Sequence, residues 1–272
     1  MATIVSFHAH PDDESIGTGG TLRRAASEGH RVVLVFATRG ERGEPVPGVL
    51  GEGEALWERR LAETFESARI LGAERVEFLG YVDSGMMGEP TNDAPYSFWG
   101  ADVEHAAHRL AAILREEQAD VLTVYDDYGG YGHPDHIQVH RVGVRAAELV
   151  GTPRVFQGTM NQDHIRRMAE RIREAVEEGL EDVEELSEEE QTFGKPEALI
   201  THAVDVTDLL EVKRASMRAH GSQIAEDSWF LAMDDESFRQ AFGTEWFIEL
   251  GRERPEGAPF EEQLLPGPAV AG

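Results

Sequence analysis

The chain has 272 residues, with 25 Lys and Arg against 52 Asp and Glu, so its formal net charge is −27. This acidic balance excludes a protein that binds nucleic acid through a basic surface. With 40% hydrophobic residues the chain can bury a large core, and because it has no cysteine, any metal site must use His, Asp and Glu.

Short β-branched or aromatic runs alternate with amphipathic stretches along the chain. The runs predict strands at Thr3–His8, Arg31–Thr38, Arg75–Tyr81, Asp120–Tyr125, Arg154–Gly158 and Ala198–Val206. The amphipathic stretches predict helices at Gly19–Gly29, Glu54–Leu71, Val103–Glu117 and Ile137–Val150. This alternation predicts an α/β, Rossmann-like fold, with a mostly parallel sheet and helices on both faces. Ligands of such sheets bind beyond the carboxyl ends of the strands.

We expect a single α/β domain over residues 1–251, followed by a loosely packed tail at 252–272 that is rich in Pro, Gly and Glu. Within the domain, the acidic stretch at about 163–191 is expected to be a helical excursion at the periphery, because its carboxylates have few basic partners nearby. The N-terminal residues do not have the pattern of a secretory signal. No apolar run is close to the length of about 20 residues that is needed to span a bilayer. We therefore expect a cytoplasmic protein with no membrane partner, and the sequence does not indicate its oligomeric state.

Two clusters of His and Asp follow predicted strands. The first strand leads into the run His8 to Glu14, and the fourth leads into the run Tyr125 to His136, which ends in His-Pro-Asp-His. Imidazole and carboxylate at short spacing are the ligands of a three-ligand Zn²⁺ site that is open to water. Each residue alone could equally be a turn residue or a helix cap. Two such clusters at the ends of two predicted strands favour a metal site.

The block Ala9 to Glu14, the run Gly129 to His136 and the segment Asp83 to Met86 carry a family resemblance. They resemble the PIG-L/LmbE-like zinc-dependent N-deacetylases, related to the N-acetylglucosaminyl-phosphatidylinositol de-N-acetylases. The glycine-rich run is especially similar to the actinobacterial branch that deacetylates the mycothiol precursor or cleaves mycothiol conjugates. The resemblance covers about the first 150 residues.

The resemblance implies a hydrolase that removes an acetyl group from an N-acetylglucosamine-type substrate, which a GlcNAc-inositol would satisfy. The alternative within the family is an amidase of thiol conjugates. The implied cofactor is Zn²⁺, with Fe²⁺ as the alternative. The implied roles are zinc ligand for His10, Asp13 and His136, general base for Asp12, acid or oxyanion stabiliser for His133, and orientation of His133 for Asp135.

The chemistry of the residues agrees with these roles. A carboxylate beside a metal-ligating one can accept a proton from water, as Asp12 would. A second His near the metal can donate a hydrogen bond to the oxyanion and protonate the leaving amine, as His133 would.

The resemblance also implies four substrate-binding residues, namely Glu44, Arg60, Asp83 and Tyr131. The acids could accept sugar hydroxyls, and the arginine could hold a phosphate or a hydroxyl. The alternatives are solvated loop acids, a surface ion pair of Arg60 with Glu63 or Glu66, and a packing aromatic at Tyr131.

Two other classes of function compete with hydrolysis. A non-heme Fe(II) oxygenase uses the same two His and one carboxylate, but it usually has a β-rich scaffold, which the βαβ pattern disfavours. A non-catalytic sugar- or metal-binding module would need neither Asp12 nor His133.

Overall fold

The computed structural model describes residues 1–177, 187–188 and 190–266. Seven strands of the described chain form one sheet in the order β3-β2-β1-β4-β5-β7-β6. The strands are β1 (Thr3–His8), β2 (Arg31–Phe36), β3 (Arg75–Phe78), β4 (Val121–Tyr125), β5 (Arg154–Thr159), β6 (His202–Asp205) and β7 (Thr244–Glu249). Strands β1 to β5 pair in parallel, and β7 lies antiparallel to both β5 and β6. The predicted α/β fold with a mostly parallel sheet is confirmed.

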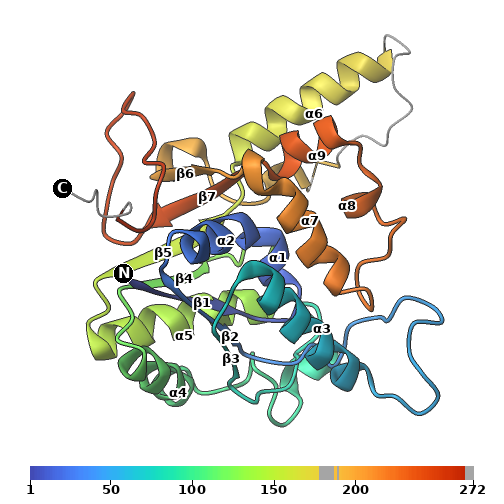
Figure 1. Cartoon of the computed structure of the whole chain (residues 1–272), viewed down its shortest axis with the longest axis vertical. Coiled ribbons are helices and arrows are strands. Elements are labelled where there is room, and N and C mark those ends of the chain that lie inside the picture. Colours follow the sequence, from blue (N-terminus) through green and yellow to red (C-terminus); the bar gives the residue numbers. More distant parts are fainter. Residues whose placement is uncertain (178–186, 189, 267–272) are drawn as a thin grey trace.

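Helices cover both faces of this sheet (Figure 1). The α-helices are α1 (Asp13–Gly17), α2 (Gly19–Ser27), α3 (Leu56–Leu71), α4 (Val103–Glu116), α5 (Pro134–Val150), α6 (Gln162–Glu177), α7 (Leu210–Ala219), α8 (Trp229–Ala232) and α9 (Asp235–Phe242). Short 3₁₀ helices lie at Pro90–Asp93, Glu190–Thr192, Glu197–Leu199 and Thr207–Leu209. None of the helices in the described ranges is long and apolar enough to cross a membrane.

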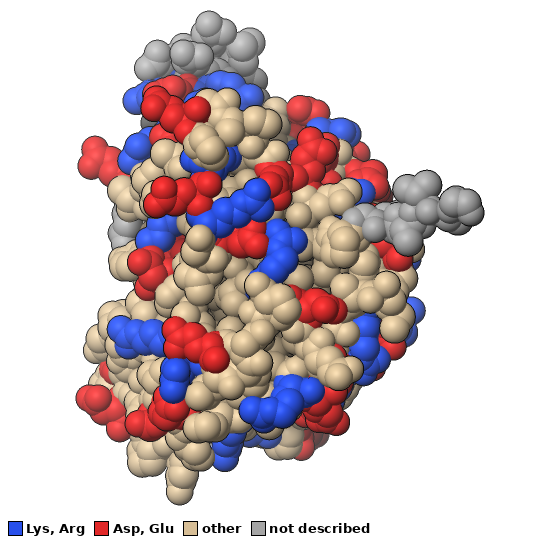
Figure 2. Space-filling model, turned by 90° about the vertical axis from the view of Figure 1, so that its left-hand side faces the viewer, with Lys and Arg blue, Asp and Glu red and all other residues tan. Residues whose placement is uncertain are grey.

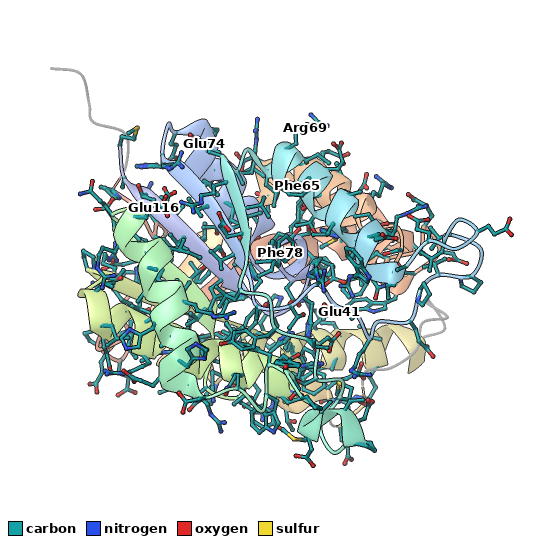
Figure 3. All side chains as sticks on the ribbon, turned by 90° about the horizontal axis from the view of Figure 1, so that it is seen from below. Glu41, Phe65, Arg69, Glu74, Phe78 and Glu116 are labelled. Atoms are coloured by element: carbon teal, nitrogen blue, oxygen red, sulfur yellow. The ribbon has the colours of Figure 1, made fainter. Side chains whose placement is uncertain are left out.

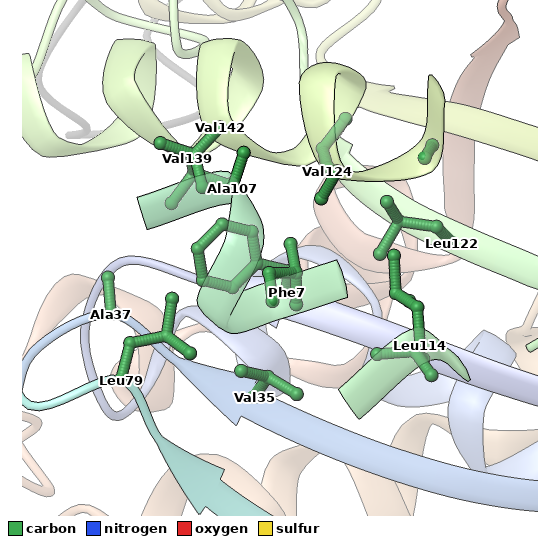
Figure 4. Packing of buried hydrophobic residues seen from close by; sticks show 14 of the residues in the cluster. Phe7, Val35, Ala37, Leu79, Ala107, Leu114, Leu122, Val124, Val139 and Val142 are labelled. Atoms are coloured by element: carbon green, nitrogen blue, oxygen red, sulfur yellow. The ribbon is translucent and has the colours of Figure 1, made fainter. Parts of the chain in front are cut away.

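Successive side chains along each strand point to opposite faces of the sheet, so the core has two layers, one on each face. In β1, Val5 and Phe7 pack with α4 and α5 (Figure 4), whereas Ile4 packs with Leu22 of α2 on the other face. The central strands are therefore buried on both sides, which explains why their sequences are mostly apolar, with buried Ser6, His8 and Thr123 as the polar exceptions in β1 and β4. On α3, Phe65 and Arg69 lie on the outer side, and Phe65 is exposed (Figure 3).

The strand order determines which loops border the candidate site. The connections from β1 and from β4 leave in opposite directions along the sheet, so β1 and β4 flank its switch point. Loops that follow two such strands border a crevice in which ligands of open α/β sheets bind. Both His- and Asp-containing clusters follow these strands.

The C-terminal third of the chain adds elements that the sequence patterns did not predict. Helices α7, α8 and α9 share a third apolar cluster, and α7 packs against α1, α2 and α3. Strand β7 was also missed. In the predicted tail, Leu264 and Leu265 are buried against the α2 side of the sheet, and residues 267–272 lie outside the described residues.

The predicted acidic excursion begins as a helix. Helix α6 extends away from the sheet at the top of Figure 1. Its first turns are attached to the body through Ala169, which is buried, and through His164, whose Nε2 lies 3.1 Å from the carbonyl oxygen of Gln240. Residues 178–186 and 189 of the expected excursion lie outside the described residues. On the face in Figure 2, acidic and basic side chains are interspersed rather than separated into a basic patch.

A buried ion pair fixes α7 and β7 to the N-terminus of α2. Lys213 Nζ lies 2.5 Å from Glu245 Oε1, and the same carboxylate accepts hydrogen bonds from the backbone amides of Gly20 and Thr21. We expect Glu245→Gln to lower the free energy of unfolding by about 3–5 kcal/mol, because it leaves a buried ammonium without its counter-charge. Denaturant unfolding would measure this loss. Arg69→Ala, which breaks the exposed pair with Glu66, is the control, and an equally small loss in both variants would contradict the prediction.

Candidate active site

The loop after β1 is a tight turn that presents two carboxylates side by side. The backbone amide of His10 donates to Asp13 Oδ2 at 2.8 Å, and the amide of Asp12 donates to Glu14 Oε2 at 2.9 Å. Asp12 has φ of +108°, a conformation that non-glycine residues rarely adopt. The turn therefore directs Asp12 and Asp13 to different partners although they are neighbours in sequence.

The loop after β4 is held by Asp126 at the strand end. The Asp126 carboxylate accepts from the amides of Tyr128 and Gly130, both at 3.0 Å, and from the Thr159 hydroxyl at 2.6 Å. Gly129 has φ of +68°, and a Cβ there would come within 2.6 Å of the His136 Cβ. Glycine at this position therefore lets the loop pass directly over His136.

Helix α5 begins within the second cluster. His133 is its N-cap, and its Nδ1 accepts from the amide of Asp135 at 3.1 Å, while Pro134 starts the helix, where a missing amide hydrogen costs nothing. His136 lies one turn later, so the two imidazoles share a face of the helix. The His136 ring stacks on Tyr125 with 4.3 Å between ring centroids.

The three predicted zinc ligands come together. Asp13 lies between the two imidazoles, with Oδ2 3.5 Å from His10 Nδ1 and Oδ1 3.4 Å from His136 Nε2. His136 Nε2 is buried and has no hydrogen-bond partner in the described chain. A buried imidazole nitrogen aimed at a carboxylate, with a second imidazole beside it, fits a Zn²⁺ site in its donor types.

Other potential ligands surround the same histidine. Nitrogen atoms of His10, His133 and His136 all lie within 4.8 Å of one another, and so do ligand atoms of His10, Asp83 and Asp135. His10 is thus the centre of the cluster. The geometry alone leaves His133 close enough to be considered as a ligand.

The role predicted for the Asp135 side chain is corrected. The Asp135 carboxylate accepts from His10 Nε2 at 3.2 Å, from the Ser84 amide at 2.9 Å and from the Ser84 hydroxyl, so it orients His10 rather than His133. His133 is oriented instead by the backbone amide of Asp135, because the N-cap geometry of α5 places that amide within hydrogen-bond distance of Nδ1. A carboxylate behind an imidazole that can ligate a metal fixes its tautomer and its orientation.

Burial and neighbouring charges shift the pKa values of Asp12 and His133 in opposite directions. Burial raises the pKa of Asp12 to about 6, although the Arg60 guanidinium opposes this shift. Burial lowers the pKa of His133 to about 3, with further lowering by His10 and His136. His133 is therefore neutral at physiological pH. Because its Nδ1 accepts a hydrogen bond, the ring proton is on Nε2.

Two of the predicted substrate-binding residues are buried within the site. Asp83 Oδ1 lies 3.6 Å from His10 Nε2; burial raises the pKa of Asp83, but His10 and two backbone amides outweigh it and leave that pKa well below its usual value. Arg60 donates to the carbonyl oxygen of Pro11, to the Gly40 carbonyl at 3.0 Å and to Asp12 Oδ2 at 3.2 Å. Arg60 thus braces the loop that carries Asp12.

The surface ion pair considered for Arg60 is absent from the described contacts. Glu66 pairs with Arg69, and Glu63 accepts from the amide and hydroxyl of Ser222. The guanidinium of Arg60 points inward because α3 is packed against α7 on that side.

Tyr131 and Glu44 differ in their relation to the site. The Tyr131 ring is edge-on to His136 at 5.0 Å between centroids and is 38% exposed, so it borders the site and remains accessible. Glu44 is exposed on the loop before α3, and its carboxylate makes no hydrogen bond or ion pair within the described chain. The structure brings Tyr131 to His136, whereas the contact of Glu44 is made by its carbonyl oxygen, which accepts from Gln223 Nε2 at 3.5 Å.

Sequence reasoning missed four residues that hold the site. Ser84 was within the segment that carried the resemblance but received no role, and Glu14 was within the first cluster but was treated only as part of its pattern. His220 and Gln223 follow α7, far from either cluster, and no local pattern marks them. Only the folded chain brings them to the loop after β1.

Comparison with known proteins gives a consistent result. Residues 5–147 match the family described as PIG-L: GlcNAc-PI de-N-acetylase. The 1D-myo-inositol 2-acetamido-2-deoxy-alpha-D-glucopyranoside deacetylase of Nocardiopsis dassonvillei is 41% identical over 96% of this chain and 99% of its own, and that of Acidothermus cellulolyticus is 38% identical over 98% and 95%. The N,N'-diacetylchitobiose deacetylase from Pyrococcus horikoshii superimposes with a TM-score of 0.59 and 25% identity, covering 91% of this chain and 83% of its own.

Proposed function

Because the chain belongs to the PIG-L family of GlcNAc-PI de-N-acetylases, we propose that it is a zinc-dependent hydrolase that removes the acetyl group from an N-acetylglucosamine-type substrate. Two relatives that match the chain over nearly their whole length are named for the deacetylation of one compound. We therefore propose 1D-myo-inositol 2-acetamido-2-deoxy-alpha-D-glucopyranoside as the substrate of this chain. We place the reaction in the cytoplasm. The observation that carries the proposal is the buried His136 Nε2, which has no hydrogen-bond partner in the described chain and lies 3.4 Å from Asp13 Oδ1.

The proposed metal ligands are His10 through Nδ1, Asp13 and His136 through Nε2. Zn²⁺ bound by such a set acts as a Lewis acid that polarises an amide carbonyl and makes water more acidic. Asp135 and Ser84 hold His10 with Nδ1 directed toward Asp13.

Asp12 is the proposed general base. Its carboxylate is adjacent to a ligand but is held by Arg60, and its side chain remains 19% exposed, so water can reach it. It takes a proton from the attacking water as the C–O bond to the acetyl carbon forms. When the C–N bond breaks, the same proton is available for the departing amine, so that the products are acetate and the free amino sugar.

His133 is proposed to stabilise the developing oxyanion. Because Nδ1 accepts from the Asp135 amide, the Nε2 proton is free to donate to the amide oxygen of the substrate. This donor is fixed in place before the reaction, which is what makes such hydrogen bonds effective in the transition state.

Acetate release tests the function directly. The purified protein, loaded with Zn²⁺, is incubated with N-acetylglucosaminyl-inositol, N-acetylglucosamine, diacetylchitobiose and the amide of a thiol conjugate, and acetate and free amine are measured. We expect the highest kcat/KM with N-acetylglucosaminyl-inositol. Cleavage of the thiol conjugate alone would establish the amidase alternative. Oxygen uptake with Fe²⁺, or binding without turnover, would contradict the proposal.

Replacing His133 distinguishes an oxyanion donor from a metal ligand. We expect His133→Ala to lower kcat by about 10²–10³-fold, the usual cost of one lost oxyanion donor, and to retain a full equivalent of metal. Steady-state kinetics and elemental analysis measure the two effects. Loss of the metal in this variant would instead make His133 a ligand, as its distance from His10 and His136 allows.

A further inference from the structure

The C-terminal part of the chain reaches the Asp12 turn through four residues that follow α7. We call His220 to Gln223 the α7 turn. It lies beyond residues 5–147, which match the family. Helix α7 packs against α1 and α3, so its end lies next to the loop that carries Asp12.

One connection runs through a buried glutamate. His220 Nε2 lies 2.6 Å from Glu14 Oε1, and both residues are fully buried. The other oxygen of Glu14 accepts from the Asp12 amide at 2.9 Å. His220 Nδ1 is buried without a hydrogen-bond partner in the described chain, so Glu14 is the one polar group that holds this ring there.

A second connection runs through Arg60. Gln223 Oε1 accepts from Arg60 Nη1 at 3.2 Å, and the other terminal nitrogen of Arg60 donates to Asp12 Oδ2 and to the carbonyl oxygen of Pro11. The backbone amide of Gln223 in turn donates to the His220 carbonyl at 2.9 Å, which joins the two connections. The α7 turn therefore supports Asp12 from the backbone side and from the carboxylate side.

The backbone of Asp12 is where such support is needed. Its φ of +108° is sparsely populated and persists only where the surroundings hold it. On the basis of the function proposed above, we propose that His220 and Gln223 are positioning residues that hold the Asp12 carboxylate in its reactive orientation. They act through Glu14 and Arg60, and neither side chain hydrogen-bonds a proposed metal ligand in the described chain.

Kinetics of matched variants test this role. We expect His220→Leu to lower kcat by about 10–100-fold, as a misplaced catalytic group does, with KM and metal content nearly unchanged. His220→Gln restores a side-chain N–H donor to Glu14 and is expected to recover much of the activity. His202→Leu is the control, because His202 is equally buried but lies on β6. Equal losses in His220→Leu and His202→Leu, or no recovery in His220→Gln, would overturn the proposal.

Gln223→Leu provides a second test if His220→Leu does not fold. Gln223 is only half-buried, and the matched control is Gln240→Leu on α9. We expect kcat to fall in Gln223→Leu and to stay at the wild-type value in Gln240→Leu. Equal kcat values in the two variants would contradict the role of Gln223.

Crystal structures make the test independent of the substrate. In His220→Leu, or in Gln223→Leu if the former does not fold, we expect the Asp12 turn to relax and its carboxylate to move. An Asp12 that superimposes on the wild type would overturn the positioning role. If the wild-type protein releases no acetate from any amino sugar, the proposed function fails, and the crystal comparison still decides whether the α7 turn positions Asp12.

Discussion

Replacing His136 by alanine is expected to remove the metal and to lower kcat/KM by about 10³-fold or more, because a metal supplies several kcal/mol of transition-state stabilisation. His136 Nε2 has no hydrogen-bond partner in the described chain, so the ring gains nothing from that nitrogen unless a metal binds. Elemental analysis after dialysis and acetate-release kinetics measure the two effects. Circular dichroism checks that the variant is folded.

The control for this prediction lies on the same helix. His140 follows His136 by one turn of α5 and contacts the backbone carbonyl of Tyr125 through Nδ1, so His140→Ala removes an imidazole without removing a proposed ligand. We expect His140→Ala to retain the metal. A His136→Ala variant that keeps a full equivalent of metal would show that His10 and Asp13 bind it with another residue.

Changing Asp12 to asparagine is expected to lower turnover, as His136→Ala does, but without loss of the metal. The metal should stay bound, whereas kcat should fall by about 10²–10⁴-fold, the usual contribution of a general base. Asparagine preserves the size of the side chain and its contact with Arg60 but cannot take up a proton at neutral pH. Steady-state kinetics at saturating substrate, together with metal analysis, measure both quantities.

An aspartate in the other loop of the site region serves as the control for Asp12→Asn. Asp127 lies in the loop after β4, where its carboxylate is exposed and pairs with Lys195. Asp127→Asn should leave kcat near the wild-type value. Wild-type turnover in Asp12→Asn would contradict a general-base role for Asp12, which precedes α1 but makes no side-chain capping hydrogen bond to it.

Hydrophobic patterns in the sequence predicted most strands and helices of the first 150 residues. The β-branched runs of β1 to β5 and the amphipathic stretches of α2 to α5 lie close to their predicted positions, because the central strands β1, β2 and β4 are buried on both faces and each helix buries one face. The elements after α6 were harder to predict. Strand β7 buries Glu245 and leaves Trp246 and Ile248 only partly buried, so its sequence does not alternate between apolar and polar residues. Helices α7 to α9 are short, which weakens their periodic signal.

The sequence by itself determined which chemistry this protein can carry. The absence of cysteine limits the metal ligands to His, Asp and Glu, and each of the two clusters follows a predicted strand. Because ligands of parallel sheets bind beyond the carboxyl ends of the strands, the pattern predicted that both clusters lie at the binding edge of the sheet. The strand order, which makes β1 and β4 neighbours, came from the structure. The family resemblance then implied that His10, Asp13 and His136 are the ligands, which remains a prediction.

Only the tertiary structure decided how those residues are supported. Asp135 was predicted to orient His133, but the folded chain directs its carboxylate to His10 and Ser84. His220 reaches Glu14 from 206 positions away in the sequence. Such contacts depend on where α7 packs against α1 and α3, and side-chain partners of this kind have no periodic pattern that a sequence could display.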